Sequence, residues 1–274
     1  MRFWIFVFGL LVLPTLSIVA PAQASDDDCR PADNQTYVQG GEECLAIQTY
    51  LPGTPAQTKT LVIVLHGDLS SGGPADYIFP VAETAAEMGA VGVAMMRIGY
   101  SGGGRSSTGR ASRSENRSEI YTPDEMDAIA DATTRLKAHH GADSVVMIGH
   151  SGGAVMTGVI LGRHPGLVQR AMLLSCPCDV PTWRQINSRK PLSRAENPLD
   201  YIDRIPAGTM IRLVTGSRDT NTWSRLSRDY AADASARGID ATFAEIAGAN
   251  HNLTTEMADS AEFKDAVRQV VTGQ

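Results

Sequence analysis

Short apolar runs rich in β-branched side chains alternate, from residue 60 onward, with segments whose apolar residues recur at helical spacing. The first run, residues 61–65, is apolar throughout, which is typical of a strand buried on both faces of a sheet. Such alternation predicts an α/β fold, with a mostly parallel central sheet and helices on both faces. We expect further strands at residues 91–96, 144–148, 170–174, 210–214 and 241–246, and helices at residues 76–88, 119–140, 152–163, 222–237 and 255–271.

Two segments lie outside this alternation. Residues 36–50 contain Gly40 and Gly41 between two apolar stretches, which predicts a β-hairpin. Residues 176–207 contain five prolines and form either a small cap over the site or a long surface connection. Because no repeat or linker divides the chain, we expect one domain over residues 25–274.

The first 24 residues have the three parts of a secretory signal peptide. Arg2 gives a positive start, residues 3–20 form an apolar run, and Ala22 and Ala24 supply the small-x-small cleavage pattern. An uncleaved membrane anchor is the alternative, but Pro14 within the run and the Ala-x-Ala ending favour cleavage. We therefore expect a secreted or periplasmic protein with no membrane anchor after cleavage.

The charge balance argues against a nucleic-acid partner. The chain carries 30 acidic and 24 basic residues, a net charge of −6, and no run of Lys or Arg. Neutralisation of phosphates supplies most of the affinity for nucleic acids, so an acidic chain of this kind is a poor candidate. The sequence leaves the oligomeric state open.

Export would place the four cysteines in an oxidising compartment, where an even number favours disulfides. Cys29 and Cys44 flank a short stretch near the mature N-terminus, and Pro177 alone separates Cys176 from Cys178. We expect the pairs Cys29–Cys44 and Cys176–Cys178.

Ser151 has the setting of a catalytic nucleophile. It lies in Gly149-His150-Ser151-Gly152-Gly153, between a predicted strand and a predicted helix. That turn strains the serine and exposes its hydroxyl, and small residues on either side let strand and helix approach each other. The alternative is a glycine-rich turn that merely begins a helix.

A serine at neutral pH needs a base, and His251 is the candidate. It lies in a loop after the last predicted strand, whereas His150 is expected to point into packing. Asp219 follows the strand at residues 210–214, where its carboxylate can orient the imidazole. Asp179, after the strand at residues 170–174, is the alternative orienting group, and a structural role for His251 is the alternative for the base.

The predicted oxyanion hole combines the backbone N–H groups of Gly152 and Asp68. Asp68 follows the strand at residues 61–65, and Gly67 lets the backbone approach closely. A carboxylate is unfavourable beside a developing anion, so we expect the Asp68 side chain to point to solvent or to bind substrate.

A Gly- and Ser-rich segment, residues 97–117, carries five arginines. Either they bind an acidic group of the substrate, or they pair with Glu115 and Glu119 on an exposed loop. The arginines are Arg97, Arg105, Arg110, Arg113 and Arg117.

The chain resembles the α/β-hydrolase superfamily over residues 36–272. The resemblance rests on Val64-Leu65-His66-Gly67, the turn around Ser151, Gly216-Ser217-Arg218-Asp219 and Asn250-His251. Within the superfamily the chain is similar to compact esterases and to dienelactone-hydrolase or prolyl-oligopeptidase-type catalytic domains.

The resemblance and the predicted triad imply a serine hydrolase that cleaves small-molecule carboxylic esters through an acyl-enzyme, with no metal or organic cofactor. One alternative is a peptidase or amidase with the same triad. Another, of a different class, is a non-catalytic binding protein on a hydrolase scaffold.

Overall fold

The computed structural model describes residue 1 and residues 32–53, 59–70, 72–109 and 120–274. Residues 2–24 of the predicted signal peptide and Cys29 lie outside the described residues, as do Arg110, Arg113 and Arg117. Within the described ranges, no helix is both long and apolar enough to span a lipid bilayer.

One eight-stranded sheet organises the fold, with the strand order β1-β2-β4-β3-β7-β8-β9-β10. The first pairs, β1 with β2 and β2 with β4, are antiparallel, and all later pairs are parallel. The predicted hairpin and the mostly parallel α/β sheet are therefore confirmed. The strands are β1 (Tyr37–Gly40), β2 (Glu43–Tyr50), β3 (Thr60–Leu65), β4 (Val91–Met95), β7 (Ser144–His150), β8 (Arg170–Leu174), β9 (Met210–Gly216) and β10 (Asp240–Ile246), and β5 (Ser101–Gly102) pairs separately with β6 (Arg105–Ser106).

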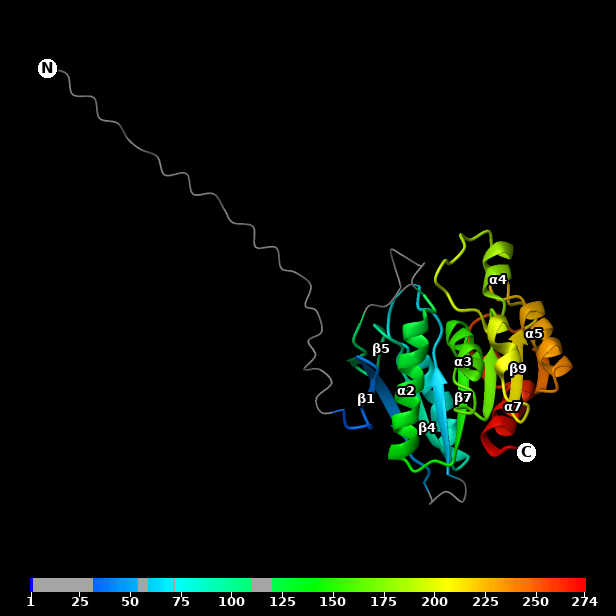
Figure 1. The fold of residues 1–274 in the computed structure, drawn as a ribbon, viewed down its shortest axis with the longest axis horizontal. Coiled ribbons are helices and arrows are strands. Elements are labelled where there is room, and N and C mark those ends of the chain that lie inside the picture. Colours follow the sequence, from blue (N-terminus) through cyan, green and yellow to red (C-terminus); the bar gives the residue numbers. More distant parts are fainter. Residues whose placement is uncertain (2–31, 54–58, 71, 110–119) are drawn as a thin grey trace.

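Helices cover both faces of the sheet, as Figure 1 shows for α2 and α3 on the nearer face. Side chains of β3 alternate between the two sides: Leu61, Ile63 and Leu65 join the cluster of α2, α3 and α5, and Val62 and Val64 join that of α1 and α7. The helical elements are η2 (Asp76–Ile78), α1 (Phe79–Glu87), α2 (Pro123–His139), α3 (Gly152–Arg163), α4 (Val180–Ile186), η4 (Pro198–Arg204), α5 (Ser224–Ala236), α6 (Thr255–Ala258) and α7 (Ala261–Thr272).

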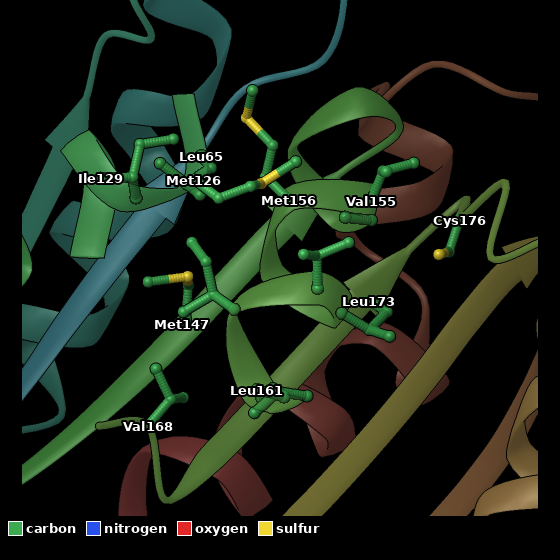
Figure 2. Packing of buried hydrophobic residues seen from close by; sticks show 14 of the residues in the cluster. Leu65, Met126, Ile129, Met147, Val155, Met156, Leu161, Val168, Leu173 and Cys176 are labelled. Carbon is green, nitrogen blue, oxygen red and sulfur yellow. The ribbon is translucent and has the colours of Figure 1, made fainter. Parts of the chain in front are cut away.

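The core between α3 and the sheet fixes where the nucleophile turn lies. Met147 of β7 and Leu173 of β8 are fully buried together with Val155 and Leu161 of α3, and Figure 2 shows these side chains gathered between helix and strands. Truncation of one such side chain to alanine costs about 2–5 kcal/mol of stability. The strand and the helix on either side of Ser151 are thus held firmly.

The C-terminal helix differs from the prediction of one helix over residues 255–271. It is divided into α6 and α7, because Ser260 adopts an extended conformation and its hydroxyl accepts the N–H of Phe263. A side-chain cap of this kind begins a new helix. Helix α2 lies within the predicted range 119–140 and begins at Pro123, with a capping box formed by Thr122 and Glu125.

Residues 176–207 are partly helical. The 3-10 helix η4 packs on α3, where Gly158 and Gly162 leave room for Pro198 and Tyr201. The short helix α4 lies beyond the ends of the strands (Figure 1). The Cys176–Cys178 disulfide is present at the start of this segment, while the Cys29–Cys44 pair stays a prediction because Cys29 is not described.

Candidate active site

Ser151 lies on a strained turn between β7 and α3. Its backbone has φ 53° and ψ −114°, a left-handed region that residues with a side chain rarely adopt. A Cβ at Gly149 would lie 2.3 Å from the Gly153 carbonyl oxygen, and one at Gly153 would lie 2.4 Å from that of Leu65. Only glycine fits at these two positions. This confirms that the small residues of the motif are needed for the strand and the helix to approach each other.

The structure brings together the three side chains predicted as a triad. The Nε2 atom of His251 lies 3.0 Å from the Ser151 Oγ, and its Nδ1 lies 2.9 Å from the Asp219 Oδ2. All three follow the carboxyl ends of parallel strands, β7, β9 and β10, which meet at one edge of the sheet. The alternative orienting group, Asp179, instead caps α4 by accepting the Thr182 N–H at 3.1 Å.

The carboxylate of Asp219 is buried but fully bonded. Its Oδ1 accepts the backbone N–H groups of Asn221 and Thr222, and its Oδ2 accepts the Thr222 hydroxyl as well as the imidazole. Burial alone would raise the pKa of Asp219, but the hydrogen bonds from His251 and Thr222 outweigh it and hold the pKa below its usual value. The group is therefore ionised at neutral pH and fixes the imidazole tautomer.

His150 is buried, as expected, and links the turn at Ser151 to the loop that carries His251. Its Nδ1 accepts the Tyr77 hydroxyl at 2.8 Å, and its Nε2–H donates to the His251 carbonyl at 2.9 Å. Burial lowers the pKa of His150 to about 4, so the ring stays neutral and keeps both bonds. No sequence pattern predicts this link.

The two predicted oxyanion donors belong to neighbouring residues, because Gly152 follows Ser151 in the chain and a Cβ on Gly152 would lie 2.5 Å from the Asp68 Oδ1. In the part of the chain that the structure describes, neither the Gly152 nor the Asp68 amide donates to a protein acceptor. The neighbouring Gly67 N–H, by contrast, is bonded to the Tyr77 hydroxyl at 2.6 Å. This arrangement suits the predicted oxyanion hole, whose donors stay a prediction.

The Asp68 carboxylate does not simply point to solvent: it is bonded to two side chains of the protein, and a contact with substrate stays a prediction. Its Oδ1 accepts from Arg97 Nη1 at 2.8 Å and its Oδ2 from the Tyr121 hydroxyl at 2.6 Å. Burial opposes ionisation, but the Arg97 cation outweighs it and lowers the pKa of Asp68. The negative charge beside Gly152 is thus neutralised from inside the protein.

The structure gives protein partners for two of the five arginines in the segment 97–117. Arg97 is fully buried against Asp68, and Arg105 donates to the Ile47 carbonyl and the Gln48 side chain. Glu115, Glu119, Arg110, Arg113 and Arg117 lie outside the described residues, so their pairing stays a prediction. A polar residue directly after a buried strand was the only signal for the burial of Arg97.

A cavity of about 740 Å³ opens over Ser151 and His251. Its walls come from the loop after β3, from the segment of α4 and from the loop after β9; they include Asp68, Leu69, Ser70, Trp183, Asn187, Arg189, Thr220 and Asn221. A second cavity of about 240 Å³ lies on the side of Tyr77, His150 and Leu253.

Asn221 connects the large cavity to the triad, a role that sequence reasoning missed. Its backbone carbonyl accepts Trp183 Nε1 and Asn187 Nδ2, both at 2.9 Å. Its side chain accepts from Arg189 at 2.9 Å and lies 3.2 Å from the Nε2 atom of His251. The segment of α4 is therefore attached directly to the loop that holds the orienting carboxylate.

A family model described as serine aminopeptidase, S33, matches residues 56–197, just over half of the chain. The chain belongs to this family of α/β-hydrolases. The matched residues include Asp68, Ser151 and α4, and end before Asp219 and His251. No curated protein matches the sequence significantly.

Solved structures agree with the fold of this hydrolase. Est1E from Butyrivibrio proteoclasticus with ferulic acid bound has a TM-score of 0.64 at 15% identity, over 85% of this chain and 98% of that one. An esterase from Pyrococcus furiosus has a TM-score of 0.65 at 17% identity, over 86% and 88%. Proline iminopeptidase from Mycobacterium smegmatis has a TM-score of 0.65 at 14% identity, over 86% and 98%. The protein is a serine hydrolase of the α/β-hydrolase fold.

Proposed function

We propose that this hydrolase cleaves carboxylic esters through an acyl-enzyme, with Ser151, His251 and Asp219 as the catalytic residues. The observation that carries the proposal is the continuous hydrogen-bonded chain from the Ser151 hydroxyl through the imidazole to the buried carboxylate. A non-catalytic binding protein has no need of this hydrogen-bonded chain, nor of a strained serine beside an open cavity.

In the first step Ser151 Oγ bonds to the ester carbonyl carbon while His251 Nε2 takes the hydroxyl proton. The carbonyl oxygen becomes an oxyanion, which the N–H groups of Gly152 and Asp68 stabilise together with the N-terminus of α3. The C–O bond to the alcohol then breaks, and His251 returns the proton to the leaving oxygen. A water molecule, deprotonated by the same imidazole, repeats the sequence and releases the acid.

The charges of the cavity favour esters over peptide substrates with a free amino terminus. An aminopeptidase must bind an ammonium group, for which an unpaired carboxylate is the natural partner. The carboxylate that lines the large cavity belongs to Asp68, and Arg97 already neutralises it. The remaining charged side chain among the described lining residues is the cation of Arg189. Peptide hydrolysis, which the family description suggests, is therefore the second candidate.

The experiment replaces Ser151 by alanine and measures hydrolysis of short p-nitrophenyl esters. We expect kcat to fall by at least about 10³-fold, the usual cost of losing a nucleophile of a triad. The exposed Ser193 is the matched control, and Ser193→Ala should keep the activity. A fluorophosphonate probe should label the native protein and not Ser151→Ala; undiminished hydrolysis by Ser151→Ala would refute the proposal.

We also propose that the protein is exported. The signal-peptide pattern of residues 1–24 supports this, as does the Cys176–Cys178 disulfide, which is rare in a reducing cytosol. N-terminal sequencing of the protein from a periplasmic or culture fraction should begin at Ser25. Recovery of the uncleaved chain from the cytosol would contradict export.

A further inference from the structure

The positive charge of Arg189 stands unpaired in the wall of the large cavity. No carboxylate of the described residues forms an ion pair with it, whereas the charge of Asp68 in the same wall is paired with Arg97. The electrostatic character of the cavity is therefore cationic. A guanidinium with no carboxylate partner of its own in the wall of a substrate cavity is free to form charge-assisted hydrogen bonds with an anionic group of the ligand.

The guanidinium of Arg189 is held in a fixed position. Its carbon lies 5.1 Å from the centre of the Trp183 ring, and its Nη2 donates to Asn221 Oδ1 at 2.9 Å. The Arg189 backbone N–H also donates to the Arg184 carbonyl at 2.8 Å. A planar cation that is already ordered loses less entropy when it binds a carboxylate through two parallel hydrogen bonds.

The fixed guanidinium is also close to the chemistry. Asn221, which bonds to Arg189, lies 3.2 Å from the Nε2 atom of His251. Both Arg189 and Ser151 line the same cavity of about 740 Å³, which is large enough for one small organic substrate. A single molecule can therefore place an ester at Ser151 and an anion at Arg189.

We propose that Arg189 binds a carboxylate of the substrate, so that the preferred esters are acidic. This inference rests on the proposed ester hydrolysis and names its substrate class. The alternative role for Arg189 is a purely structural one, in which its guanidinium only stacks on Trp183. That role does not require Arg189, because the guanidinium carbon of Arg184 already lies 5.5 Å from the centre of the same ring. The negative group lies on either the acyl or the alcohol side of the ester, and the test distinguishes the two.

The test compares matched pairs of esters with the purified protein. Mono-4-nitrophenyl glutarate and its methyl ester differ in charge on the acyl side, and 4-acetoxybenzoate and 4-acetoxybenzamide differ on the alcohol side. We expect the native protein to prefer the acidic member of one pair by about 10- to 100-fold in kcat/KM, the usual value of a charge-assisted hydrogen bond. The difference should lie mainly in KM. Added salt should reduce this ratio.

Arg189→Gln should lower the ratio of acidic to neutral kcat/KM by about tenfold or more. Arg189→Lys should restore part of it, since a lysine keeps the charge without the planar fork. The matched control is Arg218→Gln, which removes an exposed positive charge next to Asp219 but outside the cavity, and it should leave the ratio unchanged. An equal ratio in the native protein and Arg189→Gln would overturn the assignment.

A binding measurement separates failure of this inference from failure of the proposed function. If no ester is turned over, ester hydrolysis is refuted, but Ser151→Ala protein can still be titrated with the same esters by calorimetry. We expect the acidic member to bind Ser151→Ala more tightly than the neutral one, and the double variant with Arg189→Gln to lose that difference. Equal binding of both members by Ser151→Ala would overturn the assignment of Arg189.

Discussion

The Nδ2 atom of Asn221 lies 3.2 Å from Nε2 of His251, the same nitrogen that faces the Ser151 hydroxyl at 3.0 Å. Arg189 has only donors, so it keeps the Asn221 Oδ1 on its own side and directs Nδ2 at the imidazole. The amide thus donates to the neutral ring and has to give up this bond when Nε2 takes the serine proton. Asn221 therefore opposes the protonation on which the proposed mechanism depends.

Replacing Asn221 by leucine should accelerate the reaction with neutral esters. Leucine has a similar size but no donor, and the backbone groups of residue 221 that bond to Asp219 and Trp183 remain. We expect kcat to rise by about two- to tenfold, the value of one neutral hydrogen bond. Steady-state kinetics with a short neutral p-nitrophenyl ester measures this, and a tenfold fall would contradict the role given to the amide.

Asp219→Asn should lower kcat by about 10⁴-fold, because an amide in place of the carboxylate favours the wrong imidazole tautomer. Asp179 offers a matched control, since it follows the neighbouring strand but only caps α4. Asp179→Asn should leave kcat within a few-fold of the native value. If Asp179→Asn caused the larger loss, the assignment of the orienting carboxylate would be wrong.

The order of strands and helices could be predicted because apolar periodicity is a local property of the sequence. The same holds for the triad: Ser151, Asp219 and His251 each follow a recognisable strand, and parallel strands place their carboxyl ends together. The two-part C-terminal helix was missed, although Ser260 followed by an acidic Glu262 is a recognisable helix start.

The contacts around the triad could not be predicted in this way. The Asp68–Arg97 pair and the Tyr77–His150 bond join residues 29 and 73 positions apart, and single polar contacts leave no periodic pattern. Trp183 lies on a short helix in a proline-rich segment, where neither strand nor helix spacing is visible. Such long-range polar contacts depend on the finished packing of the sheet.

Breaking the buried pair of Asp68 and Arg97 should destabilise the fold. Asp68→Asn leaves a fully buried guanidinium without its counter-charge, which typically costs about 3–5 kcal/mol in the free energy of unfolding. The double variant with Arg97→Met removes both charges and should recover part of that loss. Urea unfolding of the native protein, both single variants and the double variant measures the coupling, and additive losses would contradict a direct pair.

Stability should fall as the pH drops from about 6.5 toward 4 because two histidines are buried in the neutral form. Burial lowers the pKa of His66 to about 3 and that of His150 to about 4, so in this window the unfolded chain binds protons that the folded chain excludes. Each ring should contribute about 1.4 kcal/mol per pH unit.

Urea unfolding at several pH values measures this slope. His66→Gln and His150→Gln should each make the dependence on pH less steep, whereas replacing the exposed His139 by glutamine should leave it unchanged. A native protein whose unfolding free energy stays constant between pH 4.5 and 6.5 would contradict the burial of neutral rings.

Gly153→Ala should reduce the unfolding free energy by at least about 1–3 kcal/mol. The new methyl group would collide with the backbone carbonyls of Leu65 and His66, which cannot move aside. Gly208 is the control, because a Cβ there meets nothing within 4 Å. Gly208→Ala should be neutral in thermal unfolding, and equal losses for both variants would argue against the tight approach of β3 and α3.

The attachment of α4 through the carbonyl oxygen of Asn221 has an evolutionary consequence. Trp183 and Asn187 bond to an atom that every amino acid possesses, so exchanging the residue at position 221 does not detach the helix. Selection can therefore alter the immediate neighbour of the imidazole one substitution at a time while the wall of the cavity persists. We therefore expect related enzymes with different turnover rates to differ at position 221. It is also the first position to randomise in a mutant library.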